Sequence, residues 1–198
     1  MIPQSRFWIL IFFFISGATG LIYEVVWTRL LTRVMGNTHY SIATVLTIFM
    51  AGLAIGSYLG GRWIDRKKNA LFLYAVLEGA IGLYCLLIPS IIESASPLFE
   101  WVYQTQTESY IQASLYRFFI CGAILLLPTS LMGATLPVLS KYVSRDSMFI
   151  GRDVGTLYSL NTFGAVFGAL SSAFIFMRIW GVLTTIWFAA ALNIGIAV

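Results

Sequence analysis

Two acidic residues inside otherwise apolar stretches are the first candidates for chemistry. Glu24 lies late in an apolar run that begins at Phe7, and Glu78 lies in the middle of another. An ionisable group in an apolar segment is costly, and in a membrane it usually marks a functional site. We interpret both as carboxylates that bind a proton or a cation inside a helix bundle. The alternative is an internal ion pair, Glu24 with Arg29 or Arg33.

Aromatic side chains accompany the first of these acids. Tyr23 and Trp27 flank Glu24, and Arg29 follows five residues after it. An aromatic face can hold a cation by its ring quadrupole. The predicted set of ligand or ion contacts is therefore Tyr23, Glu24, Trp27, Arg29 and Glu78.

Other kinds of active site lack the residues they need. The sequence has one histidine, His39, and two cysteines, Cys85 and Cys121, both inside apolar runs. This pattern contains neither metal-ligand spacing nor a Ser, His and Asp set, and no glycine-rich phosphate loop follows a strand. We predict no catalytic residue, metal or cofactor in this chain.

The composition is that of a membrane protein. Hydrophobic residues make up 59% of the 198 positions and charged residues only 10%, with a mean hydropathy of +0.87. A soluble domain of this size has too little interior to bury so much apolar surface. The net charge of +4 is then better explained by basic cytoplasmic loops than by nucleic-acid binding.

Apolar runs of membrane-spanning length divide the chain. A bilayer core takes about 20 mostly apolar residues per helix. Six runs meet or approach that length, which predicts an all-α membrane protein with a single transmembrane domain over residues 1–198. The six predicted helices are 7–27, 41–59, 71–92, 115–139, 157–177 and 183–198.

Basic residues are unevenly divided between the two sides of these helices. Most bases lie with Arg6 in the segments 62–68 and 140–156, whereas Arg29, Arg33 and Arg178 lie on the other side. The positive-inside rule predicts that the N-terminus is cytoplasmic and that the last helix ends inside. The segment 93–114 is acidic and aromatic, and we predict either a partly helical lid on the outer surface or an irregular loop.

Glycines repeat every fourth residue in two of the predicted helices. The second has Gly52, Gly56 and Gly60, and the fifth has Gly164 and Gly168. This spacing puts small residues on one helix face, which favours close helix packing. The motif Gly-Ala-Thr also occurs twice, at 17–19 and 133–135, and other pairs share this offset of 116 residues. An inverted three-helix repeat is one interpretation.

The loop after the second helix carries a glycine, an acid and several bases. Gly61, Asp65 and Arg66 resemble the cytoplasmic loop signature of the major facilitator superfamily, at the same place between helices two and three. Such an acid can accept from a helix N-terminus or an arginine across the bundle. We predict a latch there, with a plain positive-inside cluster as the alternative.

Longer motifs resemble one family. The first apolar segment, the Phe49–Ser57 stretch, Leu127–Pro137 and Gly155–Ala165 look like the membrane part of spermidine synthase-like proteins, often described as fused facilitator–spermidine synthase proteins. The resemblance covers most of the chain and is weakest in 93–114. It implies a fold like half of a major facilitator bundle, in a bacterial inner membrane.

In that family a cytoplasmic aminopropyltransferase-like domain follows the membrane part and would bind decarboxylated S-adenosylmethionine and a polyamine. The apolar ending at Val198 leads us to expect that the chain continues. Enzyme activity is then expected only with that further domain. The resemblance implies a membrane module that binds or transports a small cation such as a polyamine. The alternative is a non-catalytic scaffold or accessory subunit, whose partners would be other membrane subunits as well as the bilayer.

Overall fold

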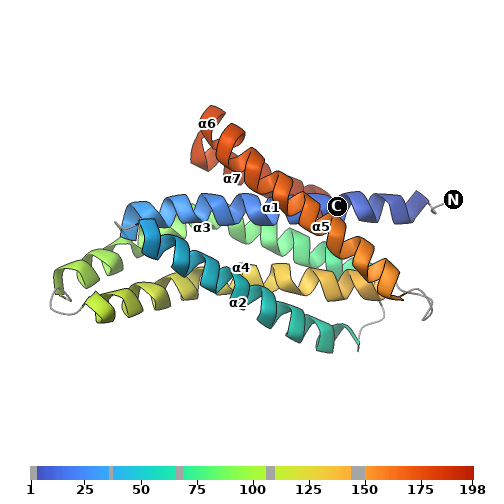
Figure 1. Cartoon of the computed structure of the whole chain (residues 1–198), viewed down its shortest axis with the longest axis horizontal. Coiled ribbons are helices and arrows are strands. Elements are labelled where there is room, and N and C mark those ends of the chain that lie inside the picture. Colours follow the sequence, from blue (N-terminus) through green and yellow to red (C-terminus); the bar gives the residue numbers. More distant parts are fainter. Residues whose placement is uncertain (1–3, 36–37, 66–68, 106–109, 144–149) are drawn as a thin grey trace.

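The computed structural model describes residues 4–35, 38–65, 69–105, 110–143 and 150–198, and this part of the chain is helical throughout. Successive long helices alternate in direction along the bundle (Figure 1). The elements are α1 (Gln4–Met35), α2 (Thr38–Ile64), α3 (Ala70–Thr105), α4 (Tyr110–Val143), α5 (Ile150–Ser171), η2 (Ser172–Phe176), α6 (Met177–Ile179) and α7 (Gly181–Ala197).

Five of the helices are long and apolar enough to cross a membrane. They are α1 to α4 and the continuous stretch Ile150–Ile179, in which η2 is a π-helical turn. The sixth, α7, is apolar but has only 17 residues. At 1.5 Å per residue it is about 25 Å long, slightly less than a typical hydrocarbon core. The architecture therefore suggests a membrane protein, with five helices of spanning length rather than six.

In its described residues the segment 93–114 is helical rather than an irregular loop. Residues 93–105 continue α3, and Tyr110 already belongs to α4. Phe99 and Val102 are buried, so the apolar face of α3 remains packed beyond Pro97. A proline costs a helix one hydrogen bond, and burial of these side chains offsets that loss.

Glycines lie where pairs of helices touch. A Cβ atom built on Gly56 would collide with the backbone of Ser130 in α4, and one on Gly60 would lie 2.8 Å from the Cβ of Ala134. In the same way, Gly164 and Gly168 of α5 face the backbone of α1. The absence of a side chain lets these backbones come into contact. The two closest pairs are α2 with α4 and α1 with α5.

These contacts repeat across the molecule. Gly56 meets Ser130, and Gly164 meets Phe14; Gly60 meets Ala134, and Gly168 meets Ala18. Helix α4 therefore corresponds to α1 with a spacing of 116 residues, while α5 corresponds to α2 with a spacing of 108. The sequence pattern used one offset, 116 residues, for both correspondences. This offset is wrong for α5 and α2, whose spacing is eight residues shorter.

Candidate functional site

Glu78 is fully buried in α3, and its carboxyl group is held by two neutral donors. The Ser16 hydroxyl donates to Oε1 at 2.6 Å, and the Asn193 amide donates to Oε2 at 2.5 Å. Glu78 forms no ion pair within the part of the chain that the structure describes. A carboxylate in an apolar interior needs a positive charge beside it, either a proton or a cation.

The amide of Asn193 is held in place by a second bond. The Tyr23 hydroxyl donates to Asn193 Oδ1 at 2.9 Å, which fixes the amide with its NH2 group toward Glu78. Asn193 is 1% exposed and Tyr23 is fully buried. Ser16, Tyr23, Glu78 and Asn193 thus form a connected polar group, which we name the Glu78 cluster. It joins α1, α3 and α7.

Small residues make this connection possible. A Cβ atom on Gly82 would lie 3.0 Å from the Ala190 oxygen and 3.2 Å from the Cβ of Asn193, and one on Gly79 would lie 3.3 Å from Ala197. Helices α3 and α7 therefore approach closely in the turn that follows Glu78. This approach brings the short Asn193 side chain within reach of the carboxyl group.

Tyr74 adds a hydroxyl one helical turn before Glu78. The residue is 2% exposed, its ring packs edge-on against Phe13, and its hydroxyl acts electrostatically on Glu78. Among the described residues, the Tyr74 hydroxyl has no partner that meets the distance and angles of a hydrogen bond. It is therefore a spare donor next to the carboxyl group.

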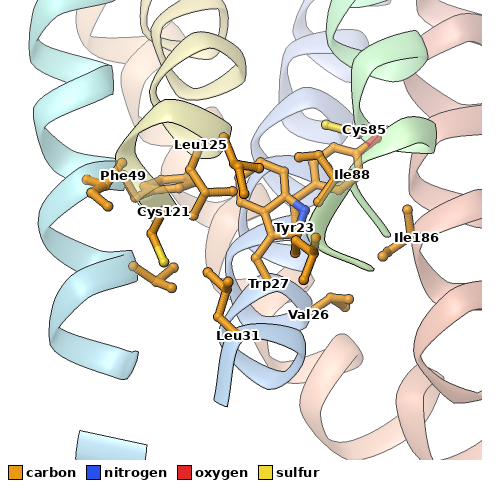
Figure 2. Close-up of a cluster of buried hydrophobic side chains, with 14 of the residues drawn as sticks. Tyr23, Val26, Trp27, Leu31, Phe49, Cys85, Ile88, Cys121, Leu125 and Ile186 are labelled. Atoms are coloured by element: carbon orange, nitrogen blue, oxygen red, sulfur yellow. The ribbon is translucent and has the colours of Figure 1, made fainter. Parts of the chain in front are cut away.

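Two of the predicted aromatic contacts belong to the core beside this cluster. Tyr23 and Trp27 stack with ring centroids 5.5 Å apart and planes 14° apart, and both are fully buried (Figure 2). Phe49 packs against the other side of Trp27, at a centroid distance of 6.5 Å. In the structure the Tyr23 and Trp27 rings therefore face each other and neighbouring side chains. The indole Nε1 of Trp27 is buried without a hydrogen-bond partner in the described part of the chain.

The other two candidates on α1 lie elsewhere. Glu24 is half-buried, and its side chain makes neither an ion pair with Arg29 or Arg33 nor another hydrogen bond within the described residues. Arg29 is exposed and lines a cleft near the end of α1. The structure therefore brings Tyr23 and Glu78 into one cluster, and places Glu24 and Arg29 outside it.

The end of α2 is joined to α4 by a lysine. Lys141 Nζ donates to the Ile64 oxygen at 2.6 Å and to the Asp65 oxygen at 3.1 Å. The positive charge thus binds the free carbonyl groups at the C-terminal end of α2. The predicted latch used the Asp65 side chain, which is exposed here; Gly61 packs near Pro137, and Arg66 lies outside the described residues.

Ser16 and Asn193 were not among the residues predicted for the site. Ser16 lies in the first apolar run and Asn193 in the last, and neither was singled out there. A stronger signal was available, because a polar residue in an apolar helix must find a partner, and Glu78 was the acceptor in need of donors. The described residues contain no group of His, Cys, Asp and Glu that would hold a metal ion.

The cluster can respond to a change of charge. A hydroxyl group both donates and accepts, so Ser16 can serve a carboxylate or a protonated carboxyl group. The Asn193 NH2 only donates, and Tyr23 holds it in that orientation. The Ser16 side of the carboxyl group can therefore adapt to a change of charge, while the Asn193 side is fixed.

Comparison with known proteins gives one relationship. The chain is 25% identical over 167 residues to polyamine aminopropyltransferase 1 of Streptomyces coelicolor. The aligned region is 84% of this chain but 28% of that protein, so the chain spans less than a third of the relative. No family model and no solved structure matches. This weak similarity points to a relation with spermidine synthase-type proteins.

Proposed function

We propose that the chain is the membrane module of a polyamine aminopropyltransferase-like protein, and that the Glu78 cluster binds a protonated amine in place of a proton. One observation carries the proposal: a fully buried carboxyl group bonded to two neutral donors, with no cationic partner in the described residues. A primary ammonium group has the charge and the donors that this carboxyl group lacks. The name of the similar protein supports the choice of a polyamine.

Binding requires the helices around the cluster to separate. The carboxyl group is sealed in this state, so α1 or α7 must move relative to α3 before an amine can enter. At Gly79 and Gly82 helix α3 presents no side chain to α7, which favours sliding of the two helices. The repeated contacts of α1 with α5 and of α2 with α4 are consistent with the inverted three-helix repeats of transporters that alternate between two open states. These features support transport of the amine across the membrane.

The membrane we propose is the bacterial cytoplasmic membrane, with the N-terminus inside. The bases of the segments 62–68 and 140–156 support this orientation. The similar protein is bacterial.

Uptake of labelled spermidine into proteoliposomes, driven by a pH gradient, tests the proposal. Glu78→Gln keeps the shape and can retain both contacts, because its NH2 can donate to Ser16 while its oxygen accepts from Asn193. The variant lacks the charge, so we expect at least a tenfold loss of uptake with little change in thermal stability. Glu100→Gln, an exposed acid on the same helix, is the matched control.

Glu24→Gln separates the two candidate acids. Uptake that is lost only in Glu78→Gln supports the cluster, whereas loss only in Glu24→Gln moves the site to the half-buried acid. Uptake unchanged in both variants rejects a cation site at either residue.

A second candidate function is a non-transporting anchor for a catalytic domain or for other membrane subunits. It is favoured by the alignment, since most of the similar protein has no counterpart in this chain. The intact mass of the native, membrane-extracted protein is the first test. A mass well above 22.0 kDa would support an attached domain. Stoichiometric co-purification with other subunits, together with absent spermidine uptake, would favour the anchor.

A further inference from the structure

An arginine-lined cleft lies at the opposite end of α1 from its N-terminus. It has a volume of about 1030 Å³ and is formed by α1, the start of α2 and the turn between α6 and α7. Its charged and polar lining consists of Arg29, Arg33, Arg178, Thr28, Thr32 and Thr184. We propose that this cleft binds an anion that bears a phosphate group.

The charges of the cleft are of one sign. Arg29, Arg33 and Arg178 are all exposed, and no acid contributes to the lining. Within the described residues none of the three has an ion-pair partner. Arg33 also borders a smaller cavity that contains Glu93, without forming an ion pair with it. Three like charges around one space repel each other unless an anion lies between them.

Guanidinium geometry favours phosphate. Arg29 and Arg33 are four residues apart on α1, so they lie on one face of the helix. Each presents a planar fork of donors that matches two oxygens of a phosphate group. Three such forks, with the Thr184 hydroxyl nearby, supply enough donors for all the oxygens of one phosphate, although the Thr28 and Thr32 hydroxyls donate to backbone carbonyls of their own helix.

The backbone contributes positive charge to the same place. Helix α7 begins at Gly181, whose φ of +78° turns the chain sharply after α6. Its first turn also lines the cleft and has no side-chain cap, and the first N–H groups of a helix have no partner within the helix itself. These N–H groups and the helix dipole favour an anion there.

The remaining walls are apolar. Ile42, Met177, Val182 and Leu183 line the cleft beside the charged groups, and Trp180 closes one edge. Trp180 stacks on Phe176 at a centroid distance of 5.0 Å, which holds the turn in place. A ligand with a phosphate and an adjoining apolar part fits this combination. An anionic lipid headgroup and a soluble phosphate ester share that chemistry.

Binding to the full purified chain in neutral detergent distinguishes these sources. The probes are phosphatidylglycerol in mixed micelles, phosphatidylcholine as the zwitterionic control, and glycerol 1-phosphate in solution. We expect phosphatidylglycerol or glycerol 1-phosphate to bind, and phosphatidylcholine not to bind. Salt should weaken the binding. Binding of the lipid alone assigns the site to a headgroup, and binding of the ester assigns it to a soluble ligand. If neither phosphatidylglycerol nor glycerol 1-phosphate binds, the proposal is overturned.

A pair of double variants tests the location. The variant Arg29→Gln/Arg33→Gln should weaken binding on the order of tenfold or more, because each lost bond is charge-assisted. The variant Arg62→Gln/Arg152→Gln removes the same charge from exposed positions outside the cleft and should bind as wild type. If both double variants lose binding equally, the probe is held by general charge attraction, and the cleft is rejected as the binding site. Arg178→Gln alone, on a different helix, repeats the test if the double variant is unstable.

Discussion

The Glu78 cluster and the arginine cleft handle charge in opposite ways. In the cluster, one carboxyl group is fully buried and both of its oxygens accept from neutral donors. In the cleft, three arginines are exposed and have no ion-pair partner among the described residues. A buried charge is tolerated only where its neighbours satisfy it, whereas an exposed charge is satisfied by water. The first site is therefore tied into the fold in this structure, whereas the second is open to a ligand without rearrangement.

Charge reversal gives the largest predicted contrast between the two regions. Glu78→Lys places an ammonium group against the fixed NH2 of Asn193, with no acid nearby, and should lower the free energy of unfolding by about 3–5 kcal/mol. Arg33→Glu in the cleft should change it by about 0.5 kcal/mol or less. Reversible unfolding of both variants in detergent measures the difference. Similar losses in the two variants would remove the distinction between the regions.

Removal of a polar side chain gives a smaller contrast. Asn193→Leu leaves Glu78 Oε2 and the Tyr23 hydroxyl each without a partner and should cost about 2–4 kcal/mol of unfolding free energy. Thr184→Val, in the exposed lining of the cleft, should cost about 0.5 kcal/mol or less. The same unfolding assay applies. A large cost at Thr184 would show that the cleft is also structural.

The smallest effect is expected from one hydroxyl group. Tyr23→Phe keeps the stack on Trp27 but removes the bond to Asn193, and should cost about 0.5–1.5 kcal/mol. The double variant Tyr23→Phe/Asn193→Leu should lose less unfolding free energy than the sum of the two single losses, because the bond between these residues is lost only once. Full additivity would place the Tyr23 hydroxyl outside the network.

The sequence was sufficient to predict the helices but not their ends. Each apolar run identified in it lies within a helix of the structure, because hydrophobic length is a local property. The ends depend on packing. Burial of Phe99 and Val102 extends α3 well past Ile92, where the predicted helix ended.

The burial of Glu78 could be predicted, and its partners could not. An acid between Leu77 and Gly79 in a long apolar run is bound to be costly, so it could be singled out from the sequence. Ser16 and Asn193 lie 62 and 115 residues away from it. They meet Glu78 only because α1 and α7 pack beside α3, which is a result of tertiary structure. The cleft was missed for the same reason, because Arg178 joins Arg29 and Arg33 through the turn before α7.

The pairing of α1 with α5 has a consequence for synthesis of the protein. The Asn161 amide bonds the Phe13 oxygen across 148 residues of chain. At a translation rate of roughly 5–20 residues per second, α1 is made about 7–30 s before its partner. During that interval the face of α1 that packs against Gly164 and Gly168 is without its partner helix. The insertion machinery must keep α1 from pairing wrongly until most of the chain has left the ribosome.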